Sequence, residues 1–244
     1  MDDQDIRRVT QLGTIVGVWA HPDDEAYLTG GLMAMAVDAG SRVVCVTATR
    51  GEHGSPDPVR WPPDRLARTR ERELAASFAA LGVTEHRWLG FEDGTCAAVD
   101  PEVVVPRLAA ILAEVAADTV VTFAPDGMTG HADHRAVARW VSSACAGLDR
   151  DVRILHATAT PGHMKRFAEL HERFDVYEPG TPDCTEEVDL VLHLRLDPDL
   201  LDRKVVALRA QATQTAGLVH EIGDEAFAEW VAEECFTVPA PTGR

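Results

Sequence analysis

Two short polar stretches of this chain combine imidazole and carboxylate side chains. The first, residues 20–25, reads AHPDDE, and the second, residues 130–135, reads GHADHR. Neutral imidazole and carboxylate are ligand types for zinc and related divalent ions, and a catalytic site keeps one coordination position open for water. The two stretches therefore predict a catalytic metal site, provided that the fold brings them together.

The first stretch offers two adjacent carboxylates that should point in different directions. His21 and Asp24 are three residues apart on a turn after Pro22, a spacing that lets both side chains converge on one ion. Asp23 should project differently and stay free to accept a proton. Taken alone, the stretch also fits a helix start, with Asp23 or Asp24 as N-cap and Glu25 favouring the positive helix end. Its place in the fold has to decide between these interpretations.

The second stretch repeats the same spacing. His131 and His134 are three residues apart and share a face if the turn is helical. One of them can bind the ion, while the other faces the substrate with Asp133 close enough to fix its tautomer and raise its pKa. A histidine near a helix start is, on its own, more often a surface residue, so the metal interpretation depends on the two stretches occurring together.

Each polar stretch follows a run of apolar, β-branched residues typical of a buried strand. Residues 14–19 (TIVGVW) precede the first stretch, and residues 118–124 (DTVVTFA) lead toward the second. In an open parallel sheet, ligands bind outside the carboxyl ends of the strands. If these two strands are neighbours, the two polar stretches face each other.

The rest of the chain alternates strands and helices in the pattern of βαβ units. Further strands are expected at 42–48, 85–89 and 152–159, and helices at 28–39, 66–81, 102–116, 161–172 and 199–216, with another helix beginning near Asp133. The charged run 221–234 is expected to form a solvated helix face, and the Pro-rich loop 54–64 is a candidate lid. The prediction is an α/β, Rossmann-like three-layer fold with a mostly parallel sheet and a single domain over 1–244.

Composition narrows the classes of partner. The chain has 23 Lys and Arg against 40 Asp and Glu, and a net charge of −17 would repel nucleic acid and anionic lipid surfaces. No run approaches the roughly 20 apolar residues of a membrane span, and the N-terminus lacks the features of a signal peptide. The five cysteines are scattered without a Cys-x-x-Cys pair, which suits a reducing cytoplasm. We expect a cytoplasmic protein without nucleic-acid or membrane partners, and the sequence leaves a homo-oligomer open.

The two polar stretches together resemble the signature of the LmbE-like, or PIG-L, deacetylases. These are metal-dependent enzymes that remove N-acetyl groups from glucosamine-containing and related substrates. Residues 49–54 (TRGEHG) are similar to the family's T-x-G-E-x-G, residues 70–73 (RERE) to its R-x-x-E, and residues 204–214 to its K…H-x-S-Q segment. The resemblance covers most of the chain.

The resemblance implies roles for the matching residues. The implied metal ligands are His21, Asp24 and His134; the implied catalytic residues are Asp23 as general base and His131 with its orienting carboxylate Asp133; the implied substrate-contacting residues are Arg70 and Asp93. Zinc is the expected ion, although the same ligands would hold ferrous iron, cobalt or nickel. The sequence departs from the family at Ala132, Thr129, Gln211 and Thr213, which leaves the identity of the substrate open.

The implied reaction is hydrolysis of an acetyl group from the amide nitrogen of an N-acetylglucosamine-type or related small molecule. Metal-activated water attacks, Asp23 takes its proton, and His131 stabilises the oxyanion. One alternative is a ferrous oxygenase, since 21–23 also reads as the H-x-D of a 2-His-1-carboxylate site. Another is a non-catalytic nucleotide-binding module, although no G-x-G-x-x-G follows the first strand. A serine hydrolase lacks its G-x-S-x-G.

Overall fold

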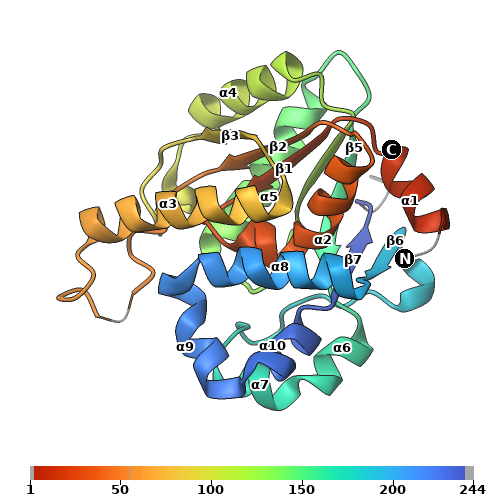
Figure 1. Cartoon of the computed structure of the whole chain (residues 1–244). Helices are drawn as coiled ribbons and strands as arrows, with labels where there is room; N and C mark the ends of the chain where they lie inside the picture. The colour runs from red at the N-terminus through yellow and green to blue at the C-terminus, as the bar shows by residue number, and fades with distance from the viewer. Residues whose placement is uncertain (1–2, 56, 240–244) are drawn as a thin grey trace.

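The described residues of this computed structural model, 3–55 and 57–239, form one seven-stranded sheet with helices on both faces (Figure 1). The strands are β1 (Ile15–Trp19), β2 (Val43–Thr47), β3 (Glu85–Trp88), β4 (Thr119–Phe123), β5 (Arg153–Thr158), β6 (Leu192–Arg195) and β7 (Glu233–Thr237). Their order across the sheet is β3-β2-β1-β4-β5-β7-β6. The strands from β3 to β5 pair in parallel, and β7 is antiparallel to both of its neighbours. The sheet is therefore mostly parallel, as predicted.

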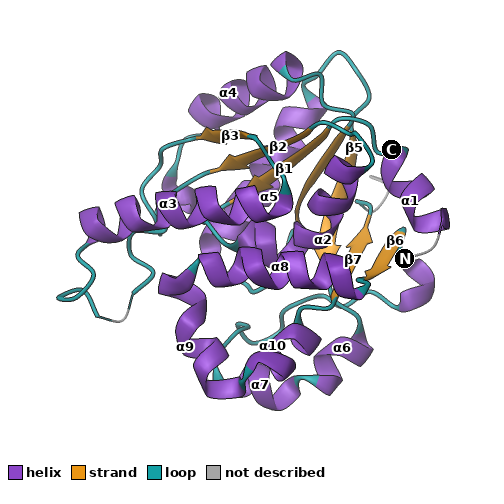
Figure 2. Cartoon of the chain, in the orientation of Figure 1, coloured by secondary structure: helices purple, strands orange, loops and turns teal. Residues whose placement is uncertain are grey.

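Helices cover both faces of this sheet. They are α1 (Asp3–Thr10), α2 (Asp24–Asp38), α3 (Pro63–Leu81), α4 (Pro101–Glu114), α5 (Ala132–Ala146), α6 (Pro161–Arg166), α7 (Ala168–Arg173), α8 (Pro198–Ala210), α9 (Ala212–Ile222) and α10 (Asp224–Trp230). α2, α3 and α8 pack together on one side, and α4 packs with α5 on the other (Figure 2). The predicted three-layer α/β class is thus confirmed. Within the described chain, no helix is long and apolar enough to span a membrane.

The point where the sheet reverses its order lies between β1 and β4. These strands pair in parallel, with Ile15 opposite Thr119, so the two predicted strands are neighbours. After β1 the chain enters α2 on one face, and after β4 it enters α5 on the other. The chain diverges here, which opens the crevice where α/β sheets of this kind bind ligands.

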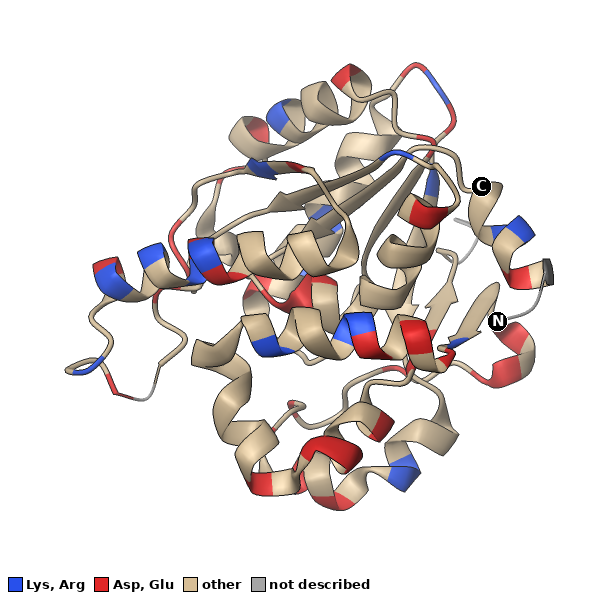
Figure 3. Ribbon diagram, viewed as in Figure 1, with Lys and Arg blue, Asp and Glu red and all other residues tan. Residues whose placement is uncertain are grey.

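The central strands are buried on both faces. Every residue of β1, β2 and β4 is buried, and none of them is charged. Figure 3 shows the charged residues on helices, loops and outer strands. Trp19 and Phe123, at the ends of β1 and β4, pack edge to face with ring centroids 5.1 Å apart. Because strands with two buried faces read as continuous apolar runs, these strands were readable in the sequence.

The C-terminal third differs most from the prediction. The helix expected over 161–172 is divided into α6 and α7 at Phe167, and the helix expected over 199–216 is divided into α8 and α9 at Gln211. Gln211 has a non-helical ψ of 50°, and its buried amide donates to Glu25 Oε1 at 2.8 Å. The break serves a long-range contact that helical periodicity cannot reveal.

The expectation of a solvated helix face over 221–234 holds for the helical part of the run, where Glu221, Asp224, Glu225 and Glu229 are exposed, but it is wrong for residues 231–234. The run contains the end of α9, all of α10 and the start of β7, and Glu234 is buried on that strand. Lys204 Nζ lies 2.8 Å from Glu234 Oε1 and compensates its charge. A charged strand whose partner lies elsewhere in the chain has no apolar alternation, so its local sequence looks like surface. α1 and β6 are likewise not predicted by the sequence.

Two predicted boundaries also shift. α2 begins at Asp24 rather than at residue 28, which puts the first polar stretch at the helix start itself. α3 begins at Pro63, so the last residues of the loop expected over 54–64 are helical. Residue 56 of that loop lies outside the described residues, and the role of the loop as a lid stays a prediction.

Candidate active site

Two histidines and one carboxylate converge at the β1–β4 edge. His21 Nδ1 lies 3.2 Å from His134 Nε2. The carboxylate of Asp24 lies 3.7 Å from His21 Nδ1 and 3.4 Å from His134 Nε2. Ligand atoms around a tetrahedral zinc, each about 2.0–2.1 Å from the ion, are separated by about 3.3 Å. The three side chains thus have the chemistry and the spacing to hold one divalent ion.

The ring nitrogens of His21 and His134 that face away from the predicted metal site also have polar partners. His21 Nε2 lies 3.0 Å from Asp93 Oδ1 and 3.3 Å from Asp133 Oδ2. His134 Nδ1 lies 2.9 Å from the carbonyl oxygen of Gly127, to which it donates as the protonated nitrogen. Metal-binding histidines are usually oriented by such partners, which set the tautomer and leave the other nitrogen free to bind. Both rings are therefore arranged as ligands.

The protonation of the two rings follows from their surroundings. Burial opposes the charged form of His21, but hydrogen bonds to Asp133 and Asp93, together with the charge of Asp24, raise its pKa to about 10. A cation that binds at Nδ1 must displace this proton, so metal binding and proton release are coupled. Burial, reinforced by the positive charge of His21, holds the pKa of His134 well below its usual range. His134 is thus neutral and ready to coordinate.

Asp133 and Asp93 both contact His21, and for Asp133 this differs from the sequence prediction. The carboxylate of Asp133, expected beside His131, instead accepts the N–H groups of Gly94 at 2.8 Å and Cys96 at 3.0 Å and faces His21. Only the backbone N–H of Asp133 reaches His131, at its Nδ1. Asp93, expected at the substrate, accepts the N–H of His53 at 2.9 Å and also faces His21. Both carboxylates therefore face His21, a candidate metal ligand.

His131 lies on the solvent side of the predicted metal site. It is the exposed N-cap residue of α5, and its ring centroid is 4.9 Å from that of His21 and 5.1 Å from that of His134. The three histidines each offer a nitrogen within 4.8 Å of the others. His131 can therefore reach either the ion or a group bound beside it.

Asp23 has an unusual backbone and a carboxylate that does not cap its helix. Its φ of 110° lies in the region that non-glycine residues avoid, at a cost of about 1–3 kcal/mol. Although Asp23 occupies the N-cap position of α2, its side chain makes no capping bond, which argues against a merely structural helix start. The carboxylate faces Arg70, with Nη2 3.3 Å from Oδ2. Burial, opposed by the charge of Arg70, raises the pKa of Asp23 to about 6.

Arg70 supports Asp23 from behind. Its guanidinium is 3% exposed and donates to the carbonyl oxygens of Gly51, at 2.9 Å, and Pro22. Gly51 has a φ of 61°, and a Cβ there would collide with the guanidinium. The glycine of the 49–54 motif is therefore required by this packing. Arg70, expected to touch the substrate, packs behind Asp23 and is not among the described residues that line the cavity at this site.

Glu25 belongs to the first polar stretch but was not predicted to be a ligand, a base or a substrate contact. This fully buried residue accepts the N–H of Asp23 at 3.0 Å, and its other oxygen accepts the amide of Gln211. Burial and the charge of Asp23 raise its pKa to about 8. Glu25 thus holds the strained backbone of Asp23 in place. Its position inside the AHPDDE stretch was the available signal, but its partner 186 residues away was not readable locally.

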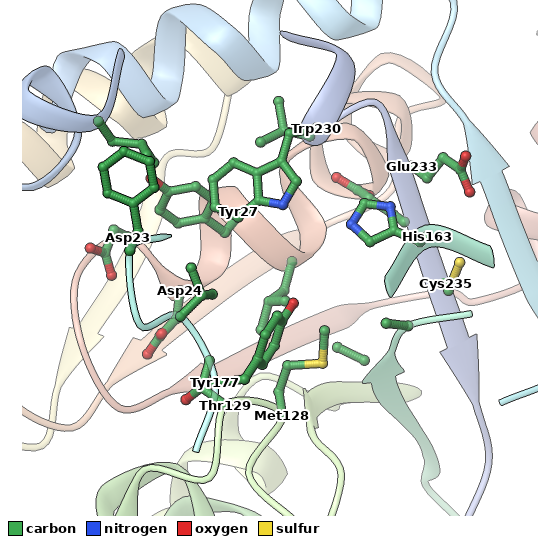
Figure 4. A pocket seen from close by; sticks show the side chains of 18 of the residues that line it. Asp23, Asp24, Tyr27, Met128, Thr129, His163, Tyr177, Trp230, Glu233 and Cys235 are labelled. Carbon is green, nitrogen blue, oxygen red and sulfur yellow. The ribbon is translucent and has the colours of Figure 1, made fainter. Parts of the chain in front are cut away.

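A cavity of about 670 Å³ opens onto this site. Asp23, Asp24, Thr129 and His134 line one end, and Figure 4 shows the two aspartates beside its aromatic walls. Among the described residues, the side chains behind the ligands and the base, Arg70 and Asp93, do not line it. Asp23, Asp24 and His134 therefore face the cavity, whereas His21, Arg70 and Asp93 are not among the described residues that line it.

Comparison with known proteins agrees with this geometry. The family described as "PIG-L: GlcNAc-PI de-N-acetylase" matches residues 16–145, more than half of the chain. The chain therefore belongs to the PIG-L family, and it is an enzyme of this metal-dependent deacetylase class. This family assignment replaces the two alternatives, a ferrous oxygenase and a nucleotide-binding module.

Two sequence relatives and one solved structure illustrate what this chain is similar to. A 1D-myo-inositol 2-acetamido-2-deoxy-alpha-D-glucopyranoside deacetylase from Acidothermus cellulolyticus is 36% identical over 250 residues, covering 86% of this chain and 84% of that protein. The enzyme of the same name from Kineococcus radiotolerans is 40% identical over 157 residues, which span 53% of this chain but only 44% of that protein. The solved N,N'-diacetylchitobiose deacetylase from Pyrococcus horikoshii superposes with a TM-score of 0.68 at 20% identity, covering 96% of this chain and 87% of that one.

Proposed function

We propose that this chain removes the acetyl group from the amide nitrogen of a small molecule that contains N-acetylglucosamine, using one divalent ion. The observation that carries the proposal is the meeting of His21, Asp24 and His134 beside the uncapped carboxylate of Asp23, at the mouth of a cavity. The N-acetylglucosaminyl compounds named for the relatives supply the substrate class.

The ion would be held by His21 Nδ1, His134 Nε2 and the carboxylate of Asp24. Two imidazoles and one carboxylate form the ligand set of many catalytic zinc sites, so zinc is the ion that we propose. When bound, such an ion supplies a water of lowered pKa, about 7 instead of 15.7, and polarises the acyl oxygen. Asp93 and Asp133 orient the ring of His21, and the Gly127 carbonyl orients the ring of His134, so that both can bind the ion.

Asp23 is the proposed general base. Its carboxylate points into the cavity beside Asp24, and no helix-capping bond occupies it. The pKa of about 6 leaves it ionised at neutral pH, yet close enough to neutrality to accept a proton and pass it on. Arg70 and Glu25 fix its side chain and its backbone, respectively. Asp23 would take the proton from water and deliver it to the departing amine.

His131 is the proposed stabiliser of the oxyanion. Its exposed ring stands next to both ligand histidines, where a group on the acyl carbon would come within its reach. A positioned donor aimed at the developing negative charge typically contributes about 10²–10³ in rate. Because the carboxylate of Asp133 is committed to His21, the orientation of His131 rests on the backbone N–H of Asp133 at its Nδ1.

The test is metal analysis of the purified protein combined with an amine-release assay across N-acetylated glucosamine compounds. We expect one equivalent of a divalent ion per chain, release of free amine and acetate, and loss of turnover on chelation with recovery on zinc addition. Full turnover in metal-depleted protein, or no amine release from any compound in the presence of added metal, would contradict the proposal.

A further inference from the structure

The walls of the cavity differ from its catalytic end. Five of the described lining residues are Phe, Tyr or Trp, and both tyrosines of the chain, Tyr27 and Tyr177, are among these. Tyr27 and Trp230 lie together with ring centroids 5.6 Å apart, and Tyr177 stands across from them beside Met128 (Figure 4). A volume of about 670 Å³ suits a drug-sized ligand, far larger than the acetyl group that the reaction removes.

The charge of these walls is one-sided. Of the described residues that line the cavity, none is Lys or Arg, whereas five are Asp or Glu. Three of the carboxylates, Glu221, Glu233 and Glu234, pair with Arg173, His193 and Lys204, which lie outside the lining. Away from the proposed ion, an anionic ligand would thus lose its hydration and find no Lys or Arg among the described lining residues in return.

The cavity lies on the amine side of the scissile bond. Asp23 lines the cavity, and Asp23 would hand the proton to the departing amine. The described residues that line the cavity do not include His131, whose ring would face the acyl oxygen. The group that fills the cavity is therefore the one carried by the amine.

We propose that the amine released by this enzyme carries an uncharged apolar or aromatic group, and that this group packs against Tyr27, Tyr177 and Trp230. The inference rests on the proposed deacetylase function and narrows its substrates. N-acetylglucosaminides with alkyl or aryl aglycones fit these walls, and those with a carboxylate or phosphate aglycone do not.

The first test compares kcat/KM for the holoenzyme on methyl, butyl, phenyl and carboxymethyl N-acetylglucosaminides, with methyl N-butanoylglucosaminide as the acyl-side control. Burial of methylene groups can contribute up to about fourfold each, so we expect butyl and phenyl to exceed methyl by at least about tenfold. Carboxymethyl should fall below methyl. Equal rates on all glycosides, or a gain confined to the N-butanoyl compound, would overturn the inference alone. No hydrolysis of any compound would overturn the proposed function as well.

A second test uses Gly217, which lines the cavity on α9. A Cβ built there meets no atom within 4 Å, so a longer side chain has room to enter. Gly217→Lys places a cation in the wall, and Gly217→Ala is the matched control for the change in helix propensity. We expect the carboxymethyl-to-methyl ratio of kcat/KM to rise about tenfold in Gly217→Lys relative to Gly217→Ala. An unchanged ratio in folded protein would contradict the exclusion of anions by the walls.

A third variant tests the aromatic wall directly. Trp230→Leu removes the larger ring but keeps an apolar residue, and the methyl glycoside reports the basal rate in the same protein. The advantage of phenyl over methyl should shrink by about threefold or more, since aromatic pairs contribute beyond their buried area. An intact phenyl advantage would show that Trp230 does not contact the substrate.

Discussion

Two buried charged clusters in this molecule differ in whether all of their polar atoms are paired within the protein. Between α8 and β7, Lys204 and Glu234 have side chains that are 0% exposed, and their charged atoms lie 2.8 Å apart. Glu234 also accepts the N–H groups of Gly31 and Leu32, in the middle of α2, at 2.7 and 2.8 Å. Every charge in this cluster has a partner inside the protein. It is a closed structural cluster.

The cluster at the start of α2 is open. His21, Asp24 and His134 aim a nitrogen, a carboxylate and a second nitrogen at one point. Their outer partners hold them in place without using the atoms that face the common point. Closure of a buried charge network stabilises a fold, whereas the same residue types left convergent and accessible form a binding site.

The largest effect on activity should come from the open cluster itself. His134→Ala removes one ligand, so we expect loss of the ion and a fall in turnover beyond the roughly 100-fold that loss of an orienting partner can cost. Metal content and amine release measured on the same preparation check this. His86→Gln, on β3, is the control histidine and should keep both. Unchanged metal content in His134→Ala would remove His134 from the ligand set.

The next largest effect should come from Asp23, and it should distinguish the role of a general base from that of a metal ligand. Asp23→Asn tolerates the positive φ and keeps the side-chain shape, but it cannot accept a proton. Metal content should stay at the wild-type level while kcat falls about 10²–10⁴-fold. Metal analysis with steady-state kinetics measures both. Near-normal turnover in metal-replete protein would exclude Asp23 as the base.

A smaller effect should come from the residues behind the open cluster. Asp93→Asn weakens the partner of His21 Nε2, and metal affinity should fall about 10–100-fold, with most activity restored at saturating metal. Competition with a chelator of known affinity measures this. Unchanged affinity with a raised KM would instead support the substrate contact that the sequence predicted for Asp93.

The smallest effect on activity, with a large effect on stability, should come from the closed cluster. Lys204→Met leaves Glu234 buried without a counter-charge, and the free energy of unfolding should fall by about 3–5 kcal/mol. Urea denaturation measures the loss, and turnover per folded molecule should change little. The double variant Lys204→Met/Glu234→Gln should recover part of the stability. A large loss of turnover in folded Lys204→Met would contradict a purely structural role for the Lys204–Glu234 cluster.

Local sequence predicted the parts of the fold that local physics controls. Buried strands such as β1 and β4 read as apolar runs, and α3 ends before Gly82, a C-cap glycine in the left-handed conformation that glycine favours, with a φ of 79°. The polar stretches could be placed at strand ends because an α/β sheet binds ligands there. The α/β class, the adjacency of the two stretches and the family were therefore within reach of the sequence.

The long-range pairings became visible only in the tertiary structure. Neither the antiparallel β7 nor the burial of Glu234 follows from the charged run 221–234, because the compensating Lys204 lies 30 residues away. In the same way, Asp133 faces His21 rather than the neighbouring His131, and Gln211 breaks a helix to reach Glu25. Residue types and their spacing specify which chemistry is available, whereas the partner of each buried polar group depends on which distant elements pack together.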